Sequence, residues 1–377
     1  MTTPKAALLN RRQLLGMGAF SLGLWLGHDV SALPPVGIPI QLGSSQPHLE
    51  QLLLTAPFTL GSRFWPSGHW RLSRQGSRLR LVTTGEDHTL PLPTLLQGGI
   101  VQWDSASPRA YRGVIWLQAA GERGLRLINW VSLEEYVWGV VPAEMPPDWP
   151  AAALHAQAIL ARTRAYPYQQ PIQPAPSQWL VDSTQDQRYG GLQAEHPATT
   201  QASRHTQGQI LTAHQQPIAT LFHSTCAGHT SANQAIFAPP ARPYLQGVPC
   251  AWCRDSPFFA PYQVTLSVAQ VQQVFGTTAL SIAARDPWGR PTALNVGSQR
   301  WSGQRFWLHL GSRLGWGLLP GNRFDLHRTP AGFTFTATGA GHGVGLCQWG
   351  SRGMALAGQS LTSILSHYFP GSLVQRI

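Results

Sequence analysis

The sequence predicts an α+β fold in which mixed antiparallel sheets are combined with short helices. From Phe58 to about Ile128, short alternating or apolar segments are separated by Gly, Pro, Ser and Asp, as in a series of strands and turns. Between Val131 and Tyr166, two helix-forming runs surround a proline-rich turn. Further hairpins and short helices follow. Because the strands and helices are segregated along the chain, the α+β class is favoured over a regular β-α-β alternation.

Length and composition allow two domains. The chain has 377 residues, of which 43% are hydrophobic, enough for at least one substantial core. Residues 33–50 are rich in Pro, Gly, Ser and Gln, so we expect a linker there. A small β-rich region is expected over 51–130, followed by a main domain over 131–377 that is built on a helix-turn-helix core.

The first 32 residues have the pattern of a bacterial export signal. A twin-arginine pair, Arg11 and Arg12, precedes the apolar run 14–26 and a small-residue cleavage pattern that ends at Ala32. The apolar run is shorter than the roughly 20 residues of a spanning helix, so no stable transmembrane segment is expected. The alternative is a buried N-terminal helix. The predicted location is the periplasm or cell wall.

The charge balance favours anionic partners. Lys and Arg number 27 against 16 Asp and Glu, a surface that attracts nucleic acid, anionic lipid or acidic wall polymers. Arginines recur along a predicted strand region at Arg71, Arg74, Arg78 and Arg80. No basic helix interleaved with aromatic residues is present, nor a zinc-finger or RNA-binding signature. We therefore expect no nucleic-acid partner.

The first helix of the core is expected to begin at a capping box formed by Ser132 and Glu135. It is predicted to run to about Trp138, where Gly139 and Pro142 interrupt it.

The second helix is expected to begin after a cap at Asp148 or a neighbour and to end at Pro167. Because Ala151–Ala161 is apolar nearly all round, we expect this helix to be buried on most faces. Arg162 and Arg164 are predicted to mark the point where it emerges into solvent.

Other elements are predicted by apolar patterning and turn residues. Expected strands are Arg78–Thr84, Gly113–Gln118, Arg305–Leu310 and Gly332–Ala337, with a hairpin formed by Gln209–Thr212 and Pro217–His223. Expected C-terminal helices are Gln348–Ala357 and Leu361–Tyr368.

Glu144 is the acidic residue that begins the turn between the two core helices. Its sequence neighbours Val140, Val141, Met145 and Trp149 are apolar. Burial among them would disfavour the ionised carboxylate and raise its pKa toward neutrality, as a general acid requires. The alternative is a solvated glutamate in an ordinary turn.

The four cysteines allow three interpretations. In an exported protein, two disulfides in any of three pairings are the default. However, Cys250 and Cys253 have the spacing of metal ligands, and Cys226 and His229 repeat it. A structural zinc ion held by Cys226, His229, Cys250 and Cys253 is therefore predicted, with His223 or Cys347 as an alternative fourth ligand. Free thiols are the third interpretation.

Several other chemistries are disfavoured. The glycine-rich segment 339–345 fits neither G-x-G-x-x-G nor a P-loop, so no nucleotide site is predicted. A cysteine peptidase would pair Cys347 with His342 or His367, but no thiol-protease signature accompanies them. No H-E-x-x-H motif supports a zinc-dependent amidase.

Five ordered motifs between residues 131 and 370 carry a resemblance to a known family. They are Glu134–Pro146, Trp149–Thr163, Asp182–Gly191, Phe222–Thr230 and Gly341–Gly350. Together they resemble the core of the SpoIID/LytB family of peptidoglycan-acting proteins. Residues 33–130 carry no such match.

The resemblance implies a lytic transglycosylase that cleaves glycan strands between N-acetylmuramic acid and N-acetylglucosamine, with Glu144 as the catalytic acid. One carboxyl group protonates the glycosidic oxygen and then deprotonates the C6 hydroxyl, which closes a 1,6-anhydro ring without a second obligatory carboxylate. Substrate-binding candidates are Gln187, Tyr189, His342, Trp138, Trp149 and Trp349. The structural alternatives are an Asx-turn loop for Gln187 and Tyr189, a glycine turn for His342 and core packing for the tryptophans.

The same resemblance implies a rival function and a partner. LytB-like relatives are described as amidase enhancers, so the rival is a noncatalytic wall-binding protein that stimulates an N-acetylmuramoyl-L-alanine amidase. Zinc is a feature of some SpoIID relatives. The expected partners are thus peptidoglycan glycan strands and a cell-wall amidase.

Overall fold

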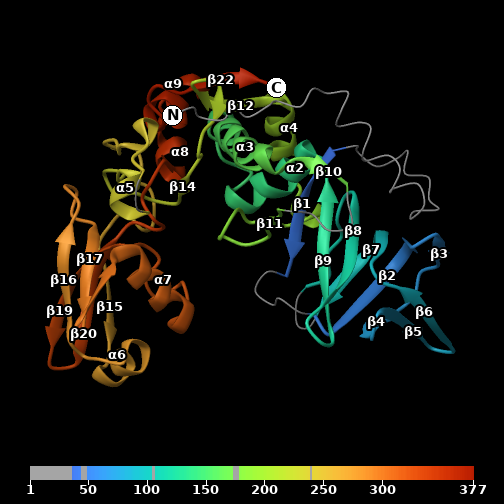
Figure 1. The fold of residues 1–377 in the computed structure, drawn as a ribbon. Helices are drawn as coiled ribbons and strands as arrows, with labels where there is room; N and C mark the ends of the chain where they lie inside the picture. The colour runs from blue at the N-terminus through green and yellow to red at the C-terminus, as the bar shows by residue number, and fades with distance from the viewer. Residues whose placement is uncertain (1–35, 44–48, 104–106, 173–177, 238–239) are drawn as a thin grey trace, which may run out of the picture. The chain divides into compact units, whose positions relative to one another are not determined.

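The computed structural model describes residues 36–43, 49–103, 107–172, 178–237 and 240–377. The chain divides into two compact units (Figure 1). The first unit runs to Ala143 and also takes in Tyr168–Glu195, and the second unit contains Glu144–Pro167 and His196–Ile377. The predicted export signal lies outside the described residues. Among the residues that are described, no helix is long and apolar enough to cross a membrane.

The first unit is built on one large, mostly antiparallel sheet (Figure 1). Its strands run in the order β10-β1-β9-β8-β7-β2-β4-β5-β6, with β11 added beside β1 and β3 beside β2. The strands are β1 (Val36–Leu42), β2 (Gln51–Leu60), β3 (Arg63–Trp65), β4 (Trp70–Gln75), β5 (Arg78–Thr83), β6 (Glu86–Pro91), β7 (Thr94–Trp103), β8 (Val114–Ala120), β9 (Gly124–Val131), β10 (Gln170–Pro171) and β11 (Leu180–Val181). The strands predicted at Arg78–Thr84 and Gly113–Gln118 are confirmed as β5 and β8.

Residues 33–50, predicted as a linker, contain a buried strand instead. Strand β1 pairs with β9 antiparallel from Ile38 to Leu42, and Ile38 and Ile40 are fully buried. Gly37 has a packing role, because a Cβ atom there would lie 2.2 Å from Nε1 of Trp130. The composition misled the prediction: Gly and Pro reduce strand propensity, but the alternate isoleucines still supply a face for the core.

The first core helix, α2 (Leu133–Glu144), is longer than predicted. Its capping box is confirmed, since the Glu135 backbone N–H donates to Ser132 Oγ at 3.3 Å and the Ser132 N–H donates to Glu135 Oε2 at 3.3 Å. Pro142 lies inside the helix and does not end it. Proline lacks one N–H donor, but its φ is helical, and the loss falls in the last turn of a helix anchored by buried residues such as Val140 and Val141.

The second core helix, α3 (Ala151–Ala165), is buried on most of its surface, as predicted. It starts at Pro150 with no side-chain cap, so the cap predicted at Asp148 is wrong. The prediction that Arg162 emerges into solvent is also wrong, because its side chain is fully buried. The guanidinium donates to the backbone carbonyl of Gln209 at 3.1 Å and to that of Ser203 at 3.0 Å, which is how a buried cation is satisfied.

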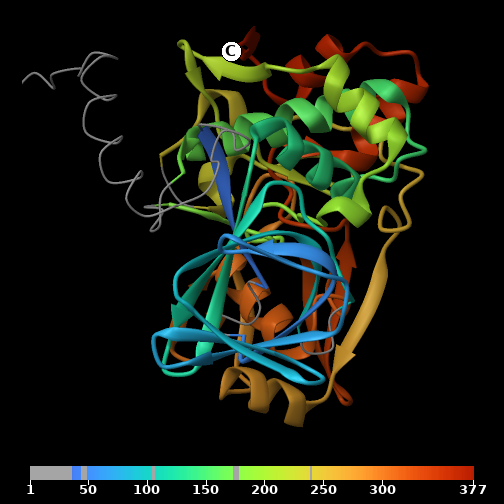
Figure 2. The same ribbon diagram turned by 90° about the vertical axis from the view of Figure 1, so that its right-hand side faces the viewer.

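The C-terminal unit contains two hydrophobic cores. The first surrounds α3 and includes α4 (Pro197–His205), α8 (Gln348–Leu356) and α9 (Leu361–Tyr368). The second core lies within a β-rich insertion. Its strands β15 (Tyr262–Leu266), β20 (Gly332–Thr338) and β19 (Arg323–Thr329) form one sheet. Strands β16 (Leu280–Arg285), β17 (Pro291–Val296) and β18 (Gln299–Ser302) form another. Figure 2 shows helix α6 (Val268–Phe275) directly after β15 at one end of this insertion.

Residues Arg305–Leu310, predicted as a strand, lie in helix α7 (Gly303–Leu314). Ser302 caps this helix by accepting from the Arg305 N–H at 3.1 Å. Phe306, Trp307 and Leu310 form its buried face. The bulky aromatic residues favour a strand locally, but their spacing also matches one face of a helix, and core packing selects the helix.

Other predictions for this unit are confirmed. The C-terminal helices are α8 and α9, and Gly332–Ala337 lies in β20. The predicted hairpin is shorter than expected: β12 (Gln209–Ala213) pairs with β13 (Gln216–Pro217) and with β22 (Leu373–Arg376), whereas β14 (Phe222–His223) pairs with β21 (Leu346–Cys347). Short helix α5 (Asn233–Ile236) completes the unit. The predicted α+β class is confirmed.

Candidate functional site

Glu144, the predicted acid, is the last residue of α2 and the first residue of the C-terminal unit. It is half-buried. Its backbone carbonyl accepts a hydrogen bond from Nε2 of Gln348 at 3.1 Å. The next residue, Met145, is 1% exposed and belongs to the core around α3. The backbone that carries Glu144 is therefore fixed on both sides, by the Met145 anchor and by α8.

The N-terminal turn of α8 presents an aromatic surface in the same unit. Trp349 contacts Trp149 edge-on, with ring centroids 5.2 Å apart, and the Arg352 guanidinium lies 5.2 Å from the Trp349 ring centre. The backbone N–H of Trp349 donates to the carbonyl of Ser224 at 3.1 Å. Trp149 and Trp349 pack on the core and are only partly buried, so they have a packing role and also remain partly exposed.

His342 lies in the glycine-rich segment next to His223. The two imidazole centroids are 5.5 Å apart, and Nδ1 of His342 accepts from the Val344 N–H at 3.1 Å. Burial and the charge of Arg290 lower the pKa of His342 to about 4, so its ring is neutral at neutral pH. Burial also lowers the pKa of His223, whose Nδ1 donates to the Val344 carbonyl at 3.1 Å.

Three predicted substrate residues lie in the N-terminal unit: Trp138, Gln187 and Tyr189. Gln187 is 1% and Tyr189 2% exposed. The Tyr136 hydroxyl donates to Oε1 of Gln187 at 3.1 Å, and the Tyr189 hydroxyl donates to Oδ1 of Asn129 at 2.9 Å. Gln187 therefore ties its loop to α2 and Tyr189 ties it to β9, and as placed here these side chains are not accessible to a ligand.

Trp138 is partly buried, and the guanidinium of Arg112 lies 5.1 Å from its ring centre. Arg112 also forms an ion pair with Glu195, Nε to Oε1 at 2.6 Å. The cation is thus fixed over the indole ring, which is a structural use of this tryptophan.

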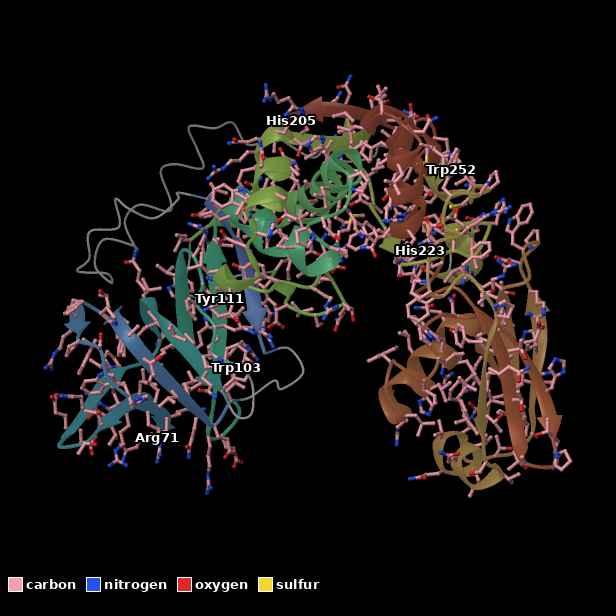
Figure 3. The ribbon with its side chains drawn as sticks, turned by 180° about the vertical axis from the view of Figure 1, so that it is seen from behind. Arg71, Trp103, Tyr111, His205, His223 and Trp252 are labelled. Atoms are coloured by element: carbon pink, nitrogen blue, oxygen red, sulfur yellow. The ribbon has the colours of Figure 1, made fainter. Side chains whose placement is uncertain are left out.

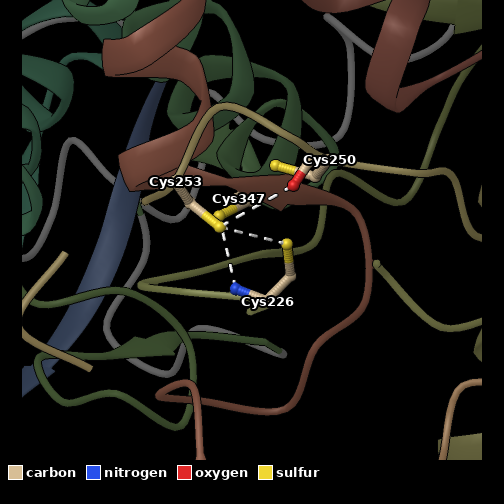
Figure 4. Close-up of side chains that lie close together, drawn as sticks. All are labelled: Cys226, Cys250, Cys253 and Cys347. Atoms are coloured by element: carbon tan, nitrogen blue, oxygen red, sulfur yellow. Dashed lines mark hydrogen bonds between the residues drawn. The ribbon is translucent and has the colours of Figure 1, made fainter. Parts of the chain in front are cut away.

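The four cysteines gather in the C-terminal unit (Figure 4). All four are buried, none forms a disulfide, and their Sγ atoms lie within 4.8 Å of one another. Cys250 and Cys253 come from one turn, whose Trp252 is labelled in Figure 3. Cys226 follows β14, and Cys347 ends β21 and caps α8, where its Sγ accepts from the Gly350 N–H at 3.3 Å. The cluster therefore joins three distant segments of the chain.

This cluster suits a tetrahedral metal. The Sγ atoms of Cys226 and Cys253 are 3.7 Å apart. Four thiolates about 2.3 Å from zinc would be about 3.8 Å from one another, so the spacing fits. Hydrogen bonds from the other thiols lower the pKa of Cys253, whereas burial raises the pKa of Cys347. A bound cation would stabilise all four thiolates.

His229, the predicted fourth ligand, lies elsewhere. Its Nδ1 donates to the carbonyl of Thr230 at 2.6 Å, and its ring stacks on Trp288 with centroids 3.5 Å apart. Cys347 is the fourth member of the cluster, and it was one of the two alternatives to His229 that the sequence suggested. Sequence spacing could not separate the two, because Cys347 is far from the other ligands in the chain and joins them through the pairing of β14 with β21.

Sequence reasoning missed two further features of this unit. The first is Gln348, which lies in the motif Gly341–Gly350 but was not predicted to contact Glu144. The second is a buried polar group beneath the glycine-rich segment. Nε of Arg290 donates to Oγ of Ser231 at 3.0 Å, and that hydroxyl donates to Asp286 at 2.5 Å. A Cβ at Gly343 would lie 2.2 Å from this guanidinium, so glycine is required there. No local pattern signals either contact.

Comparison with known proteins places this chain in a family. The family described as stage II sporulation protein, SpoIID, matches residues 121–213. The chain is 34% identical over 262 residues to stage II sporulation protein D of Bacillus amyloliquefaciens, covering 64% of this chain and 73% of that protein. It is 31% identical over 265 residues to stage II sporulation protein D of Bacillus subtilis, covering 65% and 74%. The chain therefore belongs to the SpoIID/LytB family, as its motifs predicted.

A more distant similarity reaches the LytB side of the family. The chain is 22% identical over 295 residues to the amidase enhancer of Bacillus subtilis. The match covers 62% of this chain but 39% of the enhancer.

Proposed function

We propose that this protein is an exported peptidoglycan lytic transglycosylase in which Glu144 acts first as general acid and then as general base. The observation that carries the proposal is the placement of Glu144: a half-buried carboxyl group at the end of α2, on a backbone fixed by Gln348. Family membership supports it.

The chemistry needs this one carboxyl group. The neutral acid donates its proton to the glycosidic oxygen as the bond to the muramic C1 breaks. The resulting carboxylate then takes the proton of the C6 hydroxyl, whose oxygen bonds to C1 and closes the 1,6-anhydro ring. The acid is regenerated, and no water is consumed. The edge of the Trp149–Trp349 pair offers an apolar surface for a sugar ring within the same unit.

The test is product formation from peptide-free glycan strands. Wild-type protein should release 1,6-anhydro-muramic ends, and Glu144→Gln should reduce the rate by at least about a hundredfold, since general acid-base catalysis typically contributes that much or more. Glu134→Gln, in the first turn of the same helix, is the matched control and should retain activity. Equal rates for wild type and Glu144→Gln would overturn the assignment.

A second candidate function is noncatalytic stimulation of an N-acetylmuramoyl-L-alanine amidase. It is favoured by the similarity to a protein named amidase enhancer. The two functions are separated by giving the purified protein glycan strands alone and then intact peptidoglycan with an amidase. Stimulation of the amidase without any anhydro product, and unchanged in Glu144→Gln, would establish the enhancer role instead.

We also propose that Cys226, Cys250, Cys253 and Cys347 hold one structural zinc ion. Zinc would fix the three segments that carry these residues and thereby the start of α8. Purified protein should contain about one zinc per chain by elemental analysis, and Cys347→Ser should lose it. His229→Ala should retain it. Zinc loss in the His229 variant and retention in the Cys347 variant would refute the four-cysteine assignment.

A further inference from the structure

An open groove lies along helix α7 in the C-terminal unit, and no role has been assigned to it so far. Its volume is about 660 Å³. It is lined by residues of α5 and α7 and those next to them, namely Ile236, Phe237, Ser302, Gln304, Arg305, Leu308, His309, Ser312 and Trp316. The opposite face of α7 packs in the core of the insertion, so this helix presents its second face to the groove.

The groove exposes large apolar side chains. Trp316 is 49% exposed, Leu308 43% and Phe237 40%. Trp316 is nevertheless fixed in place: a Cβ at Gly311 would lie 2.4 Å from its ring, and it meets Trp307 edge-on with centroids 5.5 Å apart. An indole held rigidly with half its surface in water is a ready platform for a flat apolar ligand face, because little entropy is lost when it binds.

The polar groups that line the groove are two hydroxyls, an amide, an imidazole and a cation. Ser302 and Ser312 are exposed hydroxyls, and the Arg305 guanidinium is held over the Trp301 ring, 3.9 Å from its centre. Among the described residues that line the groove, none is acidic. An apolar platform beside hydroxyls, an amide and a fixed cation matches a pyranose ring that carries an acetamido group and a carboxylate.

The groove also adjoins the segment that leads to the proposed catalytic residue. The Phe237 ring meets the His342 ring edge-on, with centroids 5.0 Å apart. From His342 the chain continues through Cys347 to Gln348, which bonds to the Glu144 backbone. Residues 343–348 are buried, so they connect the groove to the backbone of Glu144 through the interior of the C-terminal unit.

We propose that the α7 groove is a second glycan-binding site, which stacks an N-acetylhexosamine of a peptidoglycan strand on Trp316 and pairs a muramic carboxylate with Arg305. The inference rests on the proposed function for the identity of the strand. It adds a site remote in sequence from Glu144 that holds the strand during cleavage.

The test measures binding of long peptide-free glycan strands to full-length protein that carries Glu144→Gln, so that the strand stays intact. Adding Trp316→Ala should weaken binding about tenfold, a loss in the range of a buried aromatic contact. Arg305→Gln should weaken it less and reduce its dependence on salt. Trp288→Ala is the matched control: this tryptophan is 45% exposed, lies in the same unit and does not line the groove.

Unchanged strand binding by the Trp316→Ala protein would overturn the inference. If that variant also lost stimulation of an amidase, the groove would be a protein-docking site. The outcome is separable from that of the proposed function. If wild type forms no anhydro ends but Trp316→Ala still weakens strand binding, the groove assignment stands and the catalytic assignment fails.

Discussion

The hydrogen bond from Gln348 to the Glu144 carbonyl allows a sharp test of how the proposed acid is positioned. Gln348 is 8% exposed, and its Nε2 lies 3.1 Å from that oxygen. Gln348→Met keeps the length and apolar stem of the side chain but removes the donor. A neutral hydrogen bond contributes about 0.5–1.5 kcal/mol, so we expect a stability loss of about 1 kcal/mol.

Activity should fall further than stability does. Misplacing a catalytic group by about 1 Å can cost about a hundredfold in rate. If the bond positions Glu144, Gln348→Met should lower kcat at least about tenfold with little change in KM. The assay is release of 1,6-anhydro ends under saturating and limiting glycan, combined with denaturant unfolding of the same preparation.

Ser351→Ala is the matched control for this variant. The Ser351 hydroxyl donates to the Gln348 carbonyl at 2.8 Å and is fully buried, so its loss should cost a similar amount of stability. It leaves the Gln348 side chain and its bond to Glu144 in place. Equal losses of kcat in the two variants would show that general weakening of α8 is responsible, and the positioning argument would then be refuted.

Three further predictions concern stability. Arg162→Met should lower the free energy of unfolding by about 3–5 kcal/mol, because buried carbonyls lose a charged donor. Arg164→Met on the same helix should cost under about 1 kcal/mol. Denaturant titration of the two variants compares these losses. The pKa of His342 is about 4 in the folded protein and about 6.5 in the unfolded chain. The stability that its neutral ring contributes is therefore fully present above pH 6.5 and is lost as the pH falls toward 4. Between pH 6.5 and 4, the free energy of unfolding should fall less steeply with pH in His342→Asn, which retains an acceptor for the neighbouring N–H. The same pH dependence in variant and wild type would contradict the lowered pKa of His342. Gly139→Ala should destabilise the protein by about 1–3 kcal/mol, since the new methyl group would lie 2.6 Å from the Tyr189 ring. A melting temperature equal to that of the wild type would disprove this prediction.

Local sequence signals predicted the parts of the fold that depend on neighbouring residues. The capping box at Ser132 and Glu135 formed as expected, and so did helices α8 and α9. Errors arose where packing outweighed composition. Arg305–Leu310 became a helix because its aromatic residues share one helical face with the core, and Val36–Leu42 became a strand because Ile38 and Ile40 found a partner strand far along the chain.

The candidate site was predictable in its residue types more than in its arrangement. The motif around Glu144 identified the family and the proposed acid. Burial of Gln187 and Tyr189 was not predictable, because their hydrogen-bond partners Tyr136 in α2 and Asn129 in β9 lie about 50 to 60 residues earlier in the chain and are brought close by the tertiary fold. The groove beside α7 was hidden for a related reason: the segment expected to be a strand carries three of its lining residues, Arg305, Leu308 and His309.

The sequence by itself determined the α+β class, the family and the one carboxyl group on which the proposed chemistry depends, since these follow from short motifs and local propensities. Tertiary structure decided which residues meet. Cys347 joins the other cysteines in place of His229 only because β14 and β21 pair in parallel across more than a hundred intervening residues. That same pairing sets the start of α8 and so brings Gln348 to Glu144. Contacts of such long sequence separation are fixed by burial and backbone pairing over the whole unit, and no local pattern records them.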